Sequence, residues 1–259
     1  MASREHSTWL YRSAIVAIVC TFALIGMGGL VTSREAGLAV PDWPTSFGYN
    51  MFLLPFSQWL GKFGVFEEHS HRLLASLVGL ITAAITGWIW VRESSGIPRR
   101  VALVAIVVTL LLMGARTQPI FVAMAFLALG ALGLAIVKIL YSPKSLRWWA
   151  SLVYSIVIIQ GVLGGLRVTQ LKDQIGVLHG TLAQVFLVTL GLLALFNSRW
   201  WKESYTAKSI DDLVPRVIRS HFFYATVLIF LQLVIGATMR HQHAGLPVWD
   251  FPKAHGQWW

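Results

Sequence analysis

Residues 13–31 read SAIVAIVCTFALIGMGGLV. The stretch carries no charged side chain, and a helix needs about 20 mostly apolar residues to cross the hydrocarbon core of a bilayer. Six further runs of similar character follow at residues 73–91, 101–115, 119–137, 148–166, 175–196 and 222–239. The sequence therefore predicts an all-α fold, a polytopic membrane helical bundle of about seven transmembrane helices.

The composition agrees with a membrane protein and excludes other classes. Of the 259 residues, 56% are hydrophobic and only 12% are charged, whereas a soluble domain carries about 25% charged residues. Fourteen Phe, twelve Trp and six Tyr exclude intrinsic disorder, and Cys20 as the single cysteine excludes a disulfide scaffold. The expected surroundings are a lipid bilayer, and nucleic acid is not an expected partner despite the net charge of +10.

The distribution of Lys and Arg predicts the orientation of the chain. With seven crossings, 13 of these residues lie on the side of the N-terminus and 8 on the other side, so the N-terminus is expected inside and the long loop 33–69 outside. The run 101–115 is short, but Ile97 and Pro98 extend it and Arg116 can reach the interface. The first run is expected to be an uncleaved anchor, and the short N-terminal tail favours a bacterial cytoplasmic membrane over a mitochondrion.

An internal repeat links the two ends of the chain. Residues 28–48 read GGLVTSREAGLAVPDWPTSFG, and 208 positions later residues 236–256 read GATMRHQHAGLPVWDFPKAHG, with eight identities and no gap. Such spacing indicates duplication. Asp42 and Asp250 recur in it and are predicted to accept hydrogen bonds in turns. His241 and His243 do not recur and are interpreted as loop residues rather than a metal pair.

Two histidines are candidates to bind a haem. His71 and His179 are expected at the same outer level of the bundle, near the starts of the second and sixth spans. Two neutral imidazoles facing each other across helices are the ligands of a six-coordinate haem iron. The small neighbours that would leave room for the macrocycle are Ala75, Gly79, Gly180 and Ala183. The alternative is that each histidine is an interfacial residue bonded to a loop carbonyl.

Charged residues at the same level suggest further roles. Glu68 precedes His71 by three residues and would share its helix face, where it could act as a general base; it could equally be an N-terminal carboxylate that interacts with the helix dipole. Arg72 and Arg167 could bind haem propionates or anchor the helices at the interface.

Small and polar residues within the spans predict helix contacts. The Gly-Gly-Leu words at 28–30 and 164–166 are expected to allow close helix packing. Gln160 and Gln184 are expected to form interhelical hydrogen bonds.

Several sequence motifs of this chain resemble those of the haem A synthase family, whose members convert haem O to haem A for cytochrome oxidase. The motifs are GGLVTSREAGLAVPDWP at 28–44, E-x-x-H-R at 68–72, QGVLGGLRVT at 160–169, HGTLAQ at 179–184 and GATMRHQHAGLPVWDFP at 236–252. They occur in the family's order and span most of the chain.

The resemblance implies an activity and its site. The family has two four-helix halves, one thought to hold a haem b cofactor and the other the haem O substrate. By motif, His71 and His179 match the iron ligands of the N-terminal half, usually taken as the substrate side, and Glu68 matches the catalytic carboxylate. The reaction oxidises a porphyrin methyl to a formyl group, with water supplying the oxygen. Haem O synthase, cytochrome oxidase assembly factors and a second copy of the chain are the expected protein partners.

The chain departs from the family pattern in its organisation. Residues 1–200 are expected to form an N-terminal haem-binding repeat with an extra helix pair at 101–137, and residues 201–259 the first helix and outer loop of an incomplete second repeat. At the offset of 208, the partners of His71 and His179 would lie at 279 and 387, past the last residue. The outer-loop cysteine pair of some members is absent from the sequence.

Two other functions compete with a ring-oxidising enzyme. A b-type electron carrier, or an assembly factor that holds haem, would need the histidines but not Glu68. A transporter with a histidine proton path would bind no porphyrin.

Overall fold

The computed structural model describes residues 7–114, 118–207, 214–242, 244, 250 and 253–258. Seven helices in this part are long and apolar enough to cross a membrane, so the predicted all-α membrane fold is confirmed and the chain is an integral membrane protein. These helices are α1 Thr8–Ser33, α3 Val65–Glu93, α4 Gly96–Met113, α5 Gln118–Tyr141, α6 Leu146–Gln170, α7 Asp173–Asn197 and α10 Arg216–His241. Arg116 and His243 lie outside the described residues.

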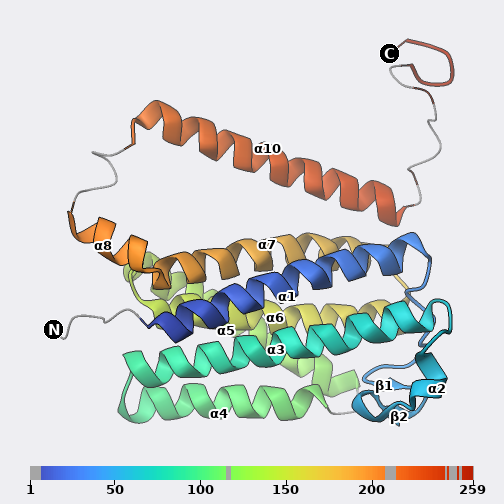
Figure 1. Ribbon diagram of the computed structural model, residues 1–259, viewed down its shortest axis with the longest axis horizontal. Coiled ribbons are helices and arrows are strands. Elements are labelled where there is room, and N and C mark those ends of the chain that lie inside the picture. Colours follow the sequence, from blue (N-terminus) through green and yellow to red (C-terminus); the bar gives the residue numbers. More distant parts are fainter. Residues whose placement is uncertain are drawn as a thin grey trace.

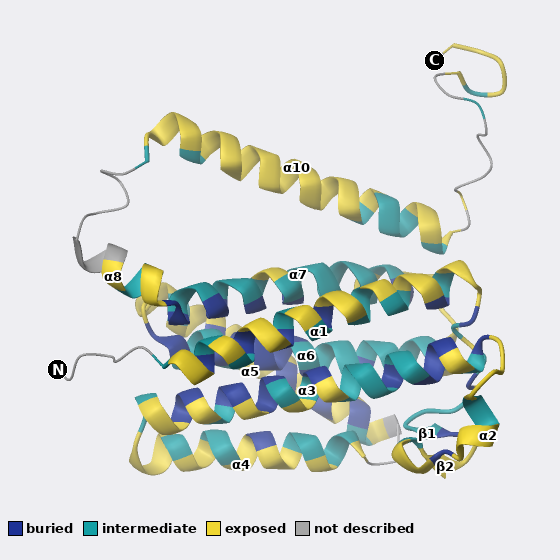
Figure 2. Cartoon of the chain, viewed as in Figure 1, coloured by how far each residue is buried: buried dark blue, intermediate teal, exposed yellow. Residues whose placement is uncertain are grey.

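Four of the helices form a closed bundle. α1 packs against α3 and α7, and α6 packs against the same two helices, so the four enclose a common core (Figure 1). α4 packs on α3 and α5 on α6, which places the predicted extra pair outside this ring. α10 packs on α7 and is almost wholly exposed, in contrast to the buried faces of the bundle (Figure 2).

The buried core consists of small and branched apolar side chains on the facing sides of these helices. Its fully buried members include Ala14, Ala17, Val78, Ile85, Val153, Leu190 and Leu193. Alanines on α1 let that helix approach its neighbours closely, which is how membrane helices gain packing energy where lipid is as apolar as the core.

Short connections fix the antiparallel order. Only Ser94 and Ser95 separate α3 from α4, and Pro98 occupies the third position of α4, where its missing N–H needs no partner. The predicted extension of the run 101–115 back through Ile97 is confirmed.

The outer loop between α1 and α3 is partly regular. It contains the paired strands β1 Thr45–Ser46 and β2 Tyr49–Asn50, the 3-10 turn η1 Met51–Leu53 and the short helix α2 Phe56–Trp59. A further short helix, α8 Arg199–Ala207, follows α7.

Helix α3 begins eight residues before the predicted span 73–91. Gly64 adopts φ +79° directly before it, and its N–H donates to Glu67 Oε2 at 2.8 Å. This carboxylate satisfies a backbone donor at the helix start and favours the extra turns. Glu68 and His71 therefore both lie within regular helix.

The repeat in the sequence is also a repeat in structure. α1 and α10 each contain 26 residues, and both their first and last residues differ by 208 positions, the offset of the sequence repeat. The residues that follow them have nearly the same backbone angles, φ −96° and ψ 6° at Arg34 and φ −93° and ψ 8° at Gln242. The division of the chain into residues 1–200 and 201–259 stays a prediction.

Asp42 and Asp250 hold equivalent turns. Asp42 accepts the N–H of Phe47 at 2.6 Å and that of Gly48 at 2.9 Å. Asp250 accepts the N–H groups five and six residues later at 2.8 and 2.7 Å. The prediction that both aspartates are turn acceptors is confirmed.

We expect Asp42→Ala to lower the stability of the chain by about 1–3 kcal/mol, the cost of removing a charged acceptor from a partly buried turn. Burial raises the pKa of Asp42, but hydrogen bonds from Thr45, Gly48 and Phe47 outweigh it and hold the pKa below its usual value. This stabilisation should therefore be present above the unfolded pKa and be lost as the pH falls through the lower folded pKa. Thermal unfolding in detergent at several pH values measures both effects.

Asp250→Ala is the matched control for this turn. Its turn follows α10, which is exposed, so the midpoint of unfolding should be unchanged. An equal loss from both variants would contradict a specific role of the first loop.

Candidate functional site

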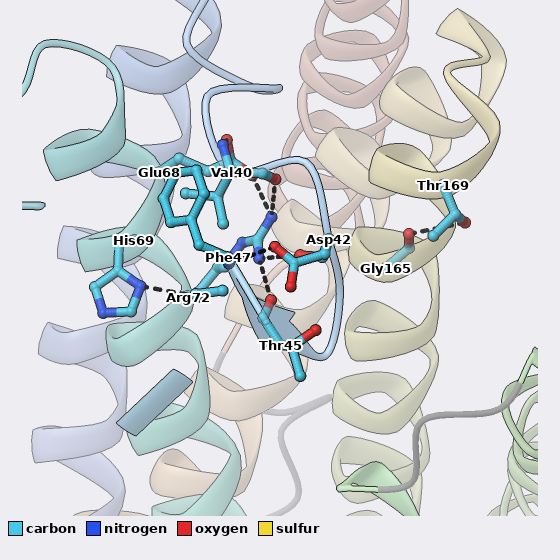
Figure 3. Close-up of polar contacts among 10 residues, drawn as sticks. Val40, Asp42, Thr45, Phe47, Glu68, His69, Arg72, Gly165 and Thr169 are labelled. Atoms are coloured by element: carbon cyan, nitrogen blue, oxygen red, sulfur yellow. Dashed lines mark hydrogen bonds and ion pairs between the residues drawn. The ribbon is translucent and has the colours of Figure 1, made fainter. Parts of the chain in front are cut away.

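The Arg72 guanidinium ties the outer loop to α3. Its Nη1 donates to the carbonyl oxygens of Asp42 at 2.6 Å and Thr45 at 3.1 Å, and its Nη2 donates to that of Val40 at 2.7 Å and to Glu68 Oε1 (Figure 3). Glu68 Oε2 in turn accepts the N–H of Val40 at 2.8 Å. We call Glu68, Arg72 and the loop groups that they bind the loop clamp.

The loop clamp is buried and nearly saturated. Glu68 is 4% exposed and Arg72 7%, and the chain itself uses four of the five N–H groups of the guanidinium. Propionate binding by Arg72 and proton transfer by Glu68 stay predictions, and the structure gives both residues a structural task that the sequence did not indicate.

The same loop also contacts α6, through the ring of Trp43. A Cβ built on Gly165 of α6 would lie 2.4 Å from the Trp43 ring, so only glycine fits there. The ring also lies 4.3 Å, between centroids, from Phe121 of α5. A second ion pair joins Arg34, after α1, to Glu67. The loop thereby contacts α3, α5 and α6.

The two predicted haem ligands are brought together. The His71 ring lies on Gly28 of α1, where a Cβ would be 3.1 Å from its Cε1, and the His179 ring lies on Gly164 of α6, at 3.5 Å. The two imidazoles are close enough to interact electrostatically. Gly28 and Gly164 were predicted to serve helix packing; here they provide room for imidazole rings.

One nitrogen of each imidazole ring has no hydrogen-bond partner in the part of the chain that the structure describes. His71 Nδ1 and His179 Nδ1 are buried and have no hydrogen-bond partner among the described residues. Gln160 Nε2 donates to the His179 carbonyl at 3.0 Å, which confirms its predicted interhelical bond, and Gln160 Oε1 is also without a partner in the described part of the chain.

The geometry fits the axial ligands of a haem. Buried polar atoms are nearly always paired in proteins, and a buried imidazole nitrogen without a protein partner is free for a metal or a bound molecule. Each imidazole lies on a glycine and keeps one nitrogen without a partner in the described part of the chain, which is compatible with bis-histidine ligation.

A third imidazole joins this group, and the loop assignment of His241 is wrong. His241 is the last residue of α10, and its ring lies 2.6 Å from the Cβ position of Gly176 on α7. It interacts electrostatically with His179, which is one turn further along α7. In the sequence, the only sign of this contact is Gly176, which precedes the candidate ligand His179 by three residues.

Arg167 lies near the same site. It follows Gly164 by three residues on α6, which places both on one helix face. Its Nη2 is 3.6 Å from Asp173 Oδ1 at the start of α7, and its side chain is 30% exposed. The Arg167 guanidinium is thus partly exposed and has one ion-pair partner, whereas that of Arg72 is buried and nearly saturated.

These features describe a polytopic membrane protein in which two imidazole rings lie on glycines of neighbouring helices. A family model described as cytochrome oxidase assembly protein matches residues 11–259, and the chain belongs to that family. Membership implies a function connected with haem.

Three curated relatives are named heme A synthase. The protein from Shewanella oneidensis is 22% identical over 97% of this chain, and the one from Shouchella clausii 21% identical over 96%. That from Novosphingobium aromaticivorans is 24% identical over 40% of this chain and 38% of its own length. The chain spans 62% and 65% of the length of the first two. No solved structure matches significantly.

We expect Arg72→Leu to cost about 3–5 kcal/mol of stability, because it leaves the Glu68 carboxylate buried without its partner. The double variant Glu68→Leu/Arg72→Leu should be more stable than Arg72→Leu alone, since the unpaired charge is gone. Thermal unfolding in detergent gives both values.

Arg199→Leu provides the control, because Arg199 and Glu203 have the same i,i+4 spacing and are 76% and 64% exposed. This change should cost no more than about 0.5 kcal/mol. A similar loss in both variants would refute the importance of burial.

Proposed function

We propose that this chain binds haem O between α3 and α7 and oxidises one of its ring methyl groups to a formyl group. His71 and His179 are the proposed axial ligands of the haem O iron, and haem b is the expected resident cofactor of the family's other half. The observation that carries the proposal is the pair of imidazoles on Gly28 and Gly164, whose Nδ1 atoms are buried and have no partner among the described residues. The site is expected at the outer face of the membrane.

The residues of the chain would orient the substrate rather than supply redox chemistry of their own. The two imidazoles would hold the haem iron, and Arg167 would bind a propionate. The haem iron and macrocycle supply the electronic chemistry. Glu68 lies about 60° around α3 from His71, close enough in direction for its carboxylate to receive a proton from a group beside the porphyrin if it exchanges a loop-clamp bond.

Gly28→Val should abolish haem retention, because its side chain would occupy the seat of the His71 ring. Gly29→Val is the matched control: it changes the next residue of the same helix, and a Cβ there meets nothing within 4 Å. Soret absorbance per mole of purified protein is the measurement. Equal haem content in both variants would contradict the proposed seat.

Glu68→Gln tests the enzymatic step. The amide oxygen can still accept the Val40 N–H, so haem content should be retained while formation of haem A falls by about 10²-fold or more, the usual worth of a general base. Glu68→Ala should abolish the formation of haem A. The extracted haems are separated chromatographically after expression with a source of haem O.

Glu67→Gln is the control at the adjacent carboxylate, which binds Arg34 and Gly64 and should not affect product formation. If Glu68→Gln makes haem A at the rate of Glu67→Gln, Glu68 has no catalytic role.

A second candidate is a haem-holding assembly factor or b-type electron carrier that does not modify the ring. The loop clamp favours it, because Glu68 already binds Arg72 and the Val40 N–H and is buried. In that case both Glu68 variants would change stability and leave the bound haem chemically unaltered.

A further inference from the structure

A pocket of about 380 Å³ lies between α3 and the outer loop. It is lined by residues 51–56, Trp59, His69 and Leu73. Its walls are apolar and aromatic, with Trp59 packed against His69 at 4.9 Å between ring centroids. The volume falls within the range of small-molecule sites, about 300–1,000 Å³.

His69 gives this apolar pocket a single polar contact. The residue is 1% exposed, and its Nδ1 lies 3.3 Å from the hydroxyl of Ser46, which is fully buried. In the tautomer in which the Ser46 O–H donates to Nδ1, the ring proton is on Nε2 and His69 lines the pocket with an N–H donor.

The pocket is accessible to a lipid-soluble molecule. The loop around it exposes Phe52, Leu53, Phe56 and Phe63. Exposed aromatic and apolar side chains at the end of a membrane helix lie at the interface with lipid. A ligand with an apolar tail can therefore reach the pocket from the bilayer.

The position of His69 relates the pocket to the haem site. His69 and His71 are two residues apart on α3, so their side chains leave the helix about 160° apart. One ring lies against Trp59 and the other on Gly28. The two sites are therefore separated by roughly the 10 Å diameter of one helix.

We propose that this pocket binds the head group of a quinone, with a ring carbonyl accepting the Nε2–H of His69 and the ring packing against Trp59. This inference rests on the proposed function, which needs an acceptor for electrons. Conversion of a methyl to a formyl group with water as the oxygen source releases four hydrogen atoms as protons and electrons. One haem O, one water and two quinones thus give one formyl haem and two quinols, with every atom and electron accounted for.

The test is calorimetric titration of the purified full-length chain in detergent with decylubiquinone. Saturable binding is expected for the unchanged chain. His69→Phe should raise the dissociation constant about tenfold or more, because the carbonyl loses its donor. His69→Gln, which keeps an N–H donor, should stay within about threefold of the unchanged chain.

Two further measurements keep the result interpretable. Leu73→Trp should block the pocket without touching the His69 donor, and it replaces His69→Phe should that variant fail to fold. Farnesol, which has an isoprenoid tail and no ring carbonyl, should not displace the quinone. Displacement by farnesol, or an unchanged dissociation constant in His69→Phe or Leu73→Trp, overturns the proposal.

The variant His71→Ala separates this proposal from the proposed function. It should lose the Soret band and still bind decylubiquinone with the original dissociation constant. Binding that disappears with His71 would place the quinone in the haem site and overturn the proposal. An unchanged chain that purifies without haem but binds quinone through His69 would refute haem oxidation and support the pocket.

Discussion

The buried guanidinium of Arg72 organises the outer end of this molecule. Three loop carbonyls and one carboxylate converge on it, and a charge in such a place is tolerated only when nearly all its donors are satisfied. Because the three carbonyl acceptors belong to the loop and the cation and carboxylate to α3, the loop has one position in which this condition is met. The docking of Trp43 on Gly165 reaches α6 from the same loop and fixes it from the other side.

Within five residues, α3 serves three different surroundings. Glu68 and Arg72 face the loop, His69 faces the pocket beside Trp59, and His71 faces Gly28 of α1. The helical period makes this division possible, since successive residues turn by about 100° and residues i and i+4 share a face. The start of α3 at Val65 is a precondition, because a helix beginning at residue 73 would leave all four residues in irregular chain.

The internal repeat allows α1 and α10 to be compared directly. α1 and α10 agree in length, in both ends and in the turn held by the aspartate that follows. They differ in surroundings: Gly28 supports an imidazole, whereas a Cβ at the equivalent Gly236 would meet nothing within 4 Å. His241, at the end of α10, instead reaches α7 near His179. The equivalent helices α1 and α10 thus contact α7 with different residues around them.

The sequence by itself determined the number of membrane helices, their order and the repeat, and it predicted the pair His71 and His179. These follow from properties encoded locally: apolar runs of membrane length, a fixed offset between similar words and residues at set positions along helices. Only the tertiary structure decided that Glu68 and Arg72 hold the loop, that Gly28 and Gly164 seat imidazole rings, and that His69 lines a pocket. Each of these depends on which groups from distant segments meet, and the spacing of residues along one helix specifies a direction but not the partner found there.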